Sequence, residues 1–142
     1  MVTYKDIHRA VADKIKSEFG NIVTSKNIKE KVKRPSFYID MDNIESKDFM
    51  GVYLDRNITI RLYYFASKQS KNRIENLETM DKLNKLFVGE VIQITETTSV
   101  NITNADIDIV DNVLHFYFDL QLSEEKEIID NTPNMDNLEY KE

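Results

Sequence analysis

The hydrophobic and polar positions of residues 106–122 alternate in two runs that meet at Asp111 and Asn112. Asp and Asn tolerate the left-handed backbone of a two-residue turn, so the pattern predicts a β-hairpin. After the turn, alternate positions point to opposite faces of the sheet. One set is apolar and predicts a core face: Leu114, Phe116, Phe118, Leu120 and Leu122. The other set suits an assembly surface better than open solvent, because it mixes Val113, His115, Tyr117, Asp119 and Gln121.

Two further segments show the same period of two. Pro35 favours an extended residue before it and begins a predicted strand over residues 36–42. In this strand Phe37, Ile39 and Met41 face one side, and Tyr38, Asp40 and Asp42 face the other. A long strand ending near Phe65 alternates Ile58, Ile60, Leu62 and Tyr64 with Thr59, Arg61, Tyr63 and Phe65. Residues 43–51 contain few strand formers and predict a polar turn region, so antiparallel pairing is the simplest connection.

Two helices are expected on one face of this sheet. Thr3 caps the first, with Asp6 completing a capping box, and Gly20 ends it. Its apolar stripe consists of Ile7, Ala10, Val11, Ile15 and Phe19. The second helix covers residues 72–87, where the apolar positions are Ile74, Leu77, Met80, Leu83, Leu86 and Phe87. With short strands near residues 22–23 and 91–95 and a Thr-rich loop at 95–99, the prediction is a single α+β domain with a mostly antiparallel, twisted sheet.

Composition narrows the function classes. The chain has 142 residues and no cysteine, which fits assembly in a cytosol. It has no run of about 18 apolar residues, so we expect no membrane partner. The net charge of −6 argues against general nucleic-acid affinity. Residues 1–34 carry +5 and the remainder −11, which indicates either an ordinary solvated surface or complementary charges on neighbouring copies.

The C-terminal segment differs in character from the rest. We expect a domain over residues 1–122, followed by an acidic tail or arm over residues 123–142. Its composition favours a disordered tail, and Pro133 breaks any helix. The alternative is an arm that docks on a neighbouring copy through sparse apolar anchors such as Ile128 and Ile129.

The residue pattern predicts no catalytic residue, cofactor or metal. His8 and His115 lie in no ligand-spaced motif, and with three glycines the chain has no glycine-rich phosphate loop. His115 and Asp119 lie four residues apart on one strand, too far apart to form a compact dyad. Asp40 and Asp42 share a strand face and leave one enzymatic alternative, a metal-dependent nuclease that also uses Asp119 or Asp108. We expect a protein that is not an enzyme.

Several of these segments, in this order, resemble the small tail terminator proteins of Gram-positive prophages and phage tail-like particles. The similar stretches are MVTYKDI at the start, KRPSFYIDM at residues 33–41, ITIRLYYF at 58–65, NLETMDKLNKLF at 76–87 and IDIVDNVLHFYFDL at 107–120. The resemblance covers roughly residues 1–122. It rests on strand and helix patterns rather than on catalytic signatures.

The resemblance implies a homo-oligomeric ring, a hexamer, that caps the head-proximal end of the tail tube in a virion or tail-like bacteriocin. The implied partners are the tail tube protein, the sheath protein if the tail is contractile, and a head–tail connector or collar protein. DNA would only pass through the ring. Another neck or head–tail joining protein is the alternative within this class. The candidate interface residues are Lys29, Lys31, Lys33, Arg34, Tyr38, Tyr63, His115, Tyr117, Ile128 and Ile129.

Overall fold

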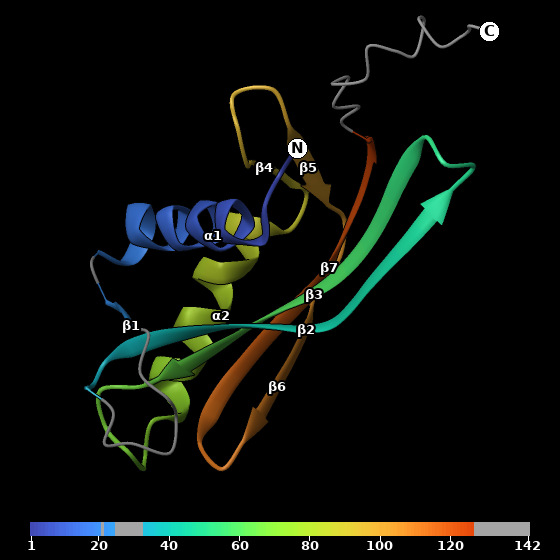
Figure 1. Ribbon diagram of the computed structural model, residues 1–142. Coiled ribbons are helices and arrows are strands. Elements are labelled where there is room, and N and C mark those ends of the chain that lie inside the picture. Colours follow the sequence, from blue (N-terminus) through green and yellow to red (C-terminus); the bar gives the residue numbers. More distant parts are fainter. Residues whose placement is uncertain (21, 25–32, 127–142) are drawn as a thin grey trace, which may run out of the picture.

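The computed structural model describes residues 1–20, 22–24 and 33–126, and it confirms an α+β fold (Figure 1). A five-stranded sheet has the order β1-β2-β3-β7-β6, and a separate two-stranded sheet pairs β4 with β5. All pairs are antiparallel except β1 with β2. The elements are α1 (Tyr4–Phe19), β1 (Val23–Thr24), β2 (Ser36–Phe49), β3 (Tyr53–Phe65), α2 (Arg73–Phe87), β4 (Glu90–Gln93), β5 (Ser99–Ile102), β6 (Asp106–Val110) and β7 (Val113–Glu125).

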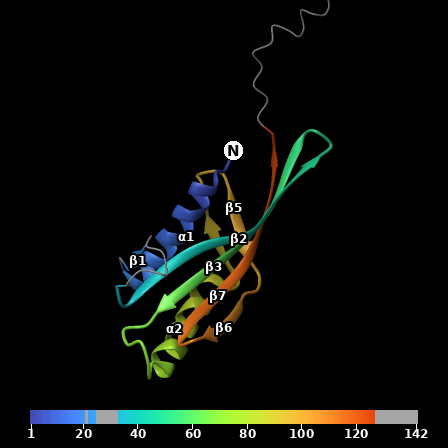
Figure 2. The same ribbon diagram turned by 60° about the horizontal axis from the view of Figure 1, so that its bottom comes forward.

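Both helices cover one face of the large sheet, as predicted, and leave its other face free of helices (Figure 2). The apolar sets of β2, β3 and β7 point toward the helices and form the core with Ile7, Val11 and Ile15 of α1. Phe87 of α2 packs against Phe118 and Phe116, with ring centroids 5.2 and 5.9 Å away. Burial of side chains of this size stabilises the fold by about 1.5–3 kcal/mol each, so this layer is the main source of stability. In the described part of the chain, neither helix is long and apolar enough to cross a membrane.

The predicted N-terminal cap is confirmed. The backbone N–H of Asp6 donates to Thr3 Oγ1 at 3.0 Å, and the backbone N–H of Thr3 donates to Asp6 Oδ2 at 3.0 Å. This reciprocal pair satisfies donors that the first helical turn cannot pair internally. At the other end, the Gly20 N–H donates to the Lys16 carbonyl at 3.0 Å.

The predicted hairpin is also confirmed. β6 pairs with β7 through Val110 and Val113, and the turn between them consists of Asp111 and Asn112. Both turn residues have positive φ, 51° and 67°. Two consecutive left-handed residues are the signature of the tight turn that matches strand twist.

The prediction of a polar turn region at residues 43–51 is wrong. β2 continues to Phe49, and the chain reverses only at Met50 and Gly51. Pairing with β3 holds these polar residues in a strand, with a register irregularity between Asp42 and Glu45. Tertiary pairing therefore overrides weak local strand preference. β7 likewise runs to Glu125, so the first residues after 122 are strand.

These extensions build a projecting arm, defined here as residues 43–57 and 121–126. It extends away from the helices beyond the compact part of the sheet (Figure 1). Arg56, only 4% exposed, ties its base: it is ion-paired with Glu124, and its Nη2 donates to the Val2 carbonyl at 2.8 Å. The Val2 N–H donates to Glu124 Oε2 at 3.0 Å. The N-terminus, β3 and β7 are thus joined at one point.

The predicted apolar stripe of α2 is partly wrong. Leu83 and Phe87 are buried as expected, but Ile74 and Leu77 are 67% and 41% exposed. The buried residues of the first half are Asn76 and Thr79. Asn76 and Asn72 donate side-chain N–H groups to the Asn112 carbonyl at 3.4 and 3.1 Å. This polar contact with the hairpin turn places the first half of the helix so that its apolar side chains face outward.

Two features of the second sheet differ from the expectation. β4 spans Glu90–Gln93, close to the predicted strand at residues 91–95. β5, at Ser99–Ile102, was not predicted, and it pairs with β4 around the Thr-rich loop. In that loop the backbone N–H groups of Ile94 and Thr95 both donate to the Thr98 carbonyl, at 2.9 and 3.1 Å.

Candidate functional site: the helix-free sheet face

The helix-free face carries polar and aromatic side chains in three rows that cross the strands. The pairing register sets the rows, since residues opposite each other in neighbouring strands share a face. The first row is Tyr38, Tyr63, His115 and Asp108; the second is Asp40, Arg61, Tyr117 and Asp106; the third is Asp42, Thr59 and Asp119. In these rows, one surface therefore carries the odd-numbered positions of β3 and β7 and the even-numbered positions of β2 and β6.

The first row is an aromatic strip. The ring centroids of Tyr38 and Tyr63 lie 6.0 Å apart, and Tyr63 meets His115 edge-on at 4.6 Å. Burial raises the pKa of Tyr63, and Arg61 opposes that shift. Burial also lowers the pKa of His115, as does the positive charge of Arg61, while Asp108 acts in the opposite direction. His115 is therefore held preferentially in its neutral form.

Arg61 organises the centre of the face. Its guanidinium carbon lies 4.2 Å from the centroid of the Tyr117 ring, and its Nε donates to Asp42 Oδ2 at 3.1 Å. Burial alone would lower the pKa of Arg61, but the hydrogen bond to Asp42 and the charges around it raise the pKa overall. A cation stacked on an aromatic ring and paired with a carboxylate is fixed in one geometry.

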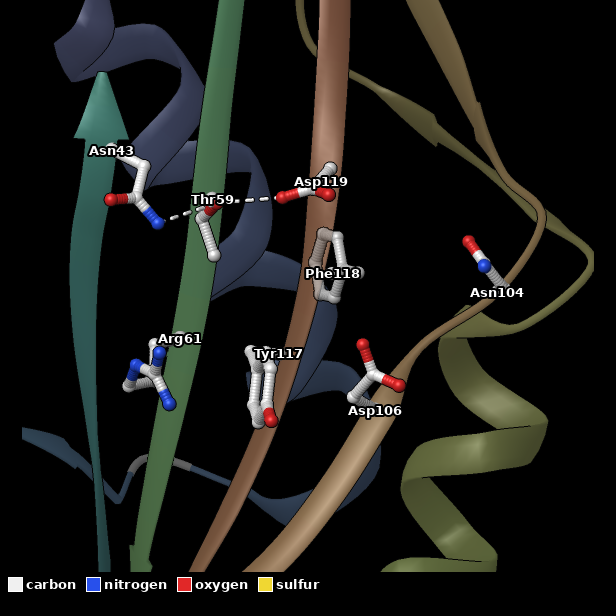
Figure 3. Close-up of a pocket in the computed structure, with 8 residues that line it drawn as sticks. All are labelled: Asn43, Thr59, Arg61, Asn104, Asp106, Tyr117, Phe118 and Asp119. Atoms are coloured by element: carbon white, nitrogen blue, oxygen red, sulfur yellow. Dashed lines mark hydrogen bonds between the residues drawn. The ribbon is translucent and has the colours of Figure 1, made fainter.

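The third row closes a shallow pocket of about 250 Å³ (Figure 3). Thr59 Oγ1 donates to Asp119 Oδ1 at 2.6 Å and accepts from Asn43 Nδ2 at 3.5 Å. The side chains of Arg61 and Asp106 also line this pocket. Asn43, Thr59 and Asp119 therefore hold one another in place at one side of the pocket.

No catalytic or metal-binding constellation emerges from this geometry. Asp42 pairs with Arg61, and Asp119 accepts from Thr59. Across residues 1–20, 22–24 and 33–126, no group of three or more His, Cys, Asp or Glu side chains is arranged to hold a metal ion. His115 faces Asp108 across the β6–β7 pair, and its ring meets that of Tyr63 edge-on.

Comparison with known protein families shows the family to which the protein belongs. The model of a phage tail terminator protein family matches residues 6–132 of this chain. The chain belongs to the phage tail terminator family. The protein is accordingly a structural protein of the phage tail and is associated with the virion. No curated protein matches the chain.

The fold brings four of the predicted interface residues onto one face. Tyr38, Tyr63 and His115 lie in one row, and Tyr117 lies in the next. Whether this face forms an interface stays a prediction. Four other candidates, Lys29, Lys31, Ile128 and Ile129, lie outside the described residues.

The two remaining candidates lie just before β2. Lys33 is exposed. Arg34 is half-buried and bonded within the chain, since its Nη1 donates to the Ala66 carbonyl at 3.0 Å and its guanidinium lies over the Phe65 ring. It is therefore less available to a partner than its position in a basic segment suggested.

The residue pattern does not reveal two features of the protein's surface. Arg61 was placed on the mixed face but was not recognised as its organising residue, because its partner Asp42 lies 19 positions away in the chain. The exposed apolar end of the arm was also missed, because Phe49 and Met50 fall where a turn is expected and Val52 and Tyr53 follow directly after it. The signal for the arm was the length of β3, since a long strand requires an equally long partner strand.

Proposed function

We propose that this protein forms a closed ring at the head-proximal end of the tail tube and ends tube polymerisation there. The observation that carries the proposal is the family match over residues 6–132. A hexamer is the stoichiometry that the family resemblance implies. The role is steric and topological: six copies related by a rotation close through heterologous contacts. One side of the ring fits the last tube ring, and the other presents a different surface that cannot accept another tube ring.

The helix-free face supports an assembly role. Tyr38, Tyr63 and Tyr117 combine large apolar rings with a polar tip, which suits interfaces that are partly wet. Arg61 is already fixed by Asp42 and Tyr117, so little side-chain freedom is lost when a partner covers it. We assign this face to a contact with a neighbouring copy or with the tube.

On the other side of the ring we place the head–tail connector or collar protein, and in a contractile tail the ring also holds the uppermost sheath ring. The ring is assembled in the host cytoplasm, and DNA passes through it without being cleaved or modified. The acidic segment at residues 123–142 and the basic segment at residues 26–34 are proposed to form rim contacts between copies. Such exposed pairs are individually weak, about 0–1 kcal/mol, but they repeat around a ring.

The test is to remove the gene from its phage or prophage and to restore it with wild-type or variant protein. Without the protein we expect tubes of uncontrolled length that carry no heads, measured by negative-stain electron microscopy. Wild-type protein restores uniform headed tails. Tyr38→Ser, on the helix-free face, is expected to restore them poorly, while Val91→Ser, at an exposed position of the small sheet, is the control and restores them fully. Uniform headed tails in the complete absence of the protein would overturn the proposal.

A nuclease assay separates the enzymatic alternative. Purified protein is incubated with DNA and Mg²⁺ or Mn²⁺, and we expect no cleavage because Asp42 and Asp119 are engaged by Arg61 and Thr59. Metal-dependent cleavage that Asp40→Ala or Asp42→Ala abolishes would make the protein an enzyme.

A further inference from the structure

Two apolar surfaces of the protein lie exposed at opposite ends of the large sheet. The arm patch, defined as Phe49, Met50, Val52 and Tyr53, surrounds the turn between β2 and β3, and Met50 is 80% exposed. The helix patch, defined as Ile74, Leu77 and Ile109, lies at the other end, where α2 begins and β6 ends. Isolated exposed apolar residues are ordinary, but clusters of them mark interaction sites.

The two patches cannot meet within one molecule. The arm patch adjoins the first residue of β3, and the loop that follows the last residue of β3 leads to the helix patch. β3 has 13 residues, so at roughly 3.3 Å per residue its ends lie about 40 Å apart. Figure 1 shows the arm and the start of α2 at opposite extremes of the fold. A contact between the patches therefore joins two copies.

The arm and the loop that leads into α2 carry net charges of opposite sign. The arm holds five acidic residues and three basic ones, and two of the basic residues are already ion-paired inside it: Arg56 with Glu124 and Lys126 with Asp48. The segment that leads into the helix patch, residues 67–73, contains Lys68, Lys71 and Arg73 and no acidic residue. Within α2, Glu75 accepts hydrogen bonds from Tyr64 and Ser67, and Glu78 is exposed, so the excess of positive charge is confined to the loop that precedes the helix. An acidic arm and a basic loop beside the helix patch favour one orientation of contact over its reverse.

We propose that the arm patch of one copy docks on the helix patch of the next, and that this head-to-tail contact builds the terminator ring. The inference rests on the proposed ring function and names the surfaces that close it. Two different surfaces that recognise each other make a heterologous contact, which generates a ring when the rotation closes. Met50 suits the arm because its flexible side chain adapts to the surface that it meets.

Cysteine cross-linking tests the contact directly, because the chain contains no cysteine of its own. The double variant Met50→Cys/Ile74→Cys is assembled into particles and treated with a short bismaleimide, and the products are detected by immunoblotting of denaturing gels. We expect a ladder of covalent oligomers that stops at the ring size. The matched control Met50→Cys/Val91→Cys, which pairs the arm with an exposed apolar position outside the helix patch, is expected to give no ladder.

The outcomes distinguish the competing contacts. Met50→Cys alone or Ile74→Cys alone has one reactive site per copy, so a dimer from either would indicate like-to-like contact and overturn the inference. A cross-link from Met50→Cys to the tube protein would assign the arm to the tube and also overturn it. If a ring is visible by electron microscopy but the double variant gives no ladder, this inference fails while the proposed function stands. Single copies at the tail end would overturn both.

Discussion

Glu124 is the residue whose removal should reveal what holds the base of the arm. In Glu124→Ala, the guanidinium of Arg56, 4% exposed, loses its carboxylate partner and retains the Val2 carbonyl. Removing one partner of a buried pair typically costs about 3–5 kcal/mol, because the remaining charge stays desolvated. The Glu124 side chain is 16% exposed, so water can reach part of the site, and we expect the lower end, about 3 kcal/mol. Total stabilities are about 5–15 kcal/mol, so the loss is large.

Urea denaturation followed by circular dichroism measures this loss as a change in the free energy of unfolding. Glu125→Ala is the matched control, since Glu125 is the next residue of β7 and is exposed; its effect should stay within about 0.5 kcal/mol. The double variant Arg56→Met/Glu124→Leu removes both charges and should be less destabilised than Glu124→Ala alone. A loss below about 1 kcal/mol in Glu124→Ala would refute the reasoning, because it would mean that Arg56 regains full hydration without its partner.

Three further predictions concern local features. Thr3→Ala removes the capping-box acceptor and should destabilise the protein by about 1 kcal/mol, measured by thermal unfolding against the exposed-loop control Thr103→Ala. Asn112→Ala places a Cβ residue at φ 67° and should cost about 1–2 kcal/mol, whereas Asn112→Gly should cost little; equal losses would exclude backbone strain as the cause. Because burial lowers the pKa of folded His115, the unfolded chain binds more protons below its ordinary pKa of about 6.5, so stability should fall as pH drops through that value. His115→Asn should reduce this pH dependence, and His8→Asn, which leaves His115 in place, should preserve its contribution.

The features that the sequence could predict are those with local signals. The hairpin at Asp111 and Asn112 follows from residues that tolerate positive φ between two alternating runs. The capping box at Thr3 and Asp6 follows from spacing alone. The mixed face of Tyr38, Tyr63, His115 and Tyr117 follows from the period of two, which assigns each residue to a side of its strand.

The features that the sequence alone could not predict depend on residues that are distant from each other in the chain. Residues 43–49 contain few strand formers and are strand because β3 pairs with them. The first half of α2 is oriented by Asn76, which bonds to a carbonyl 36 positions away. The alternation of apolar and polar positions assigns Tyr63 and His115 each to the mixed face of its own strand. Only the β3–β7 register puts the two residues side by side. A slip of two residues would keep both apolar faces in the core and would separate Tyr63 from His115, so the alternation alone does not determine the register.

The arm has the buried ion pair at its base and the residues of the proposed assembly contact at its tip. A projecting two-stranded hairpin is at best marginally stable in water, so an arm that must present an apolar tip needs support. Here β7 adds a third strand along β3 as far as Tyr53 and Glu125, and Arg56 with Glu124 anchors the base. A supported arm loses less conformational freedom when it docks, which strengthens each contact without enlarging it. We therefore infer that the ion pair at the base stabilises the position of the arm, and that the apolar residues at the tip make the contact with the next copy.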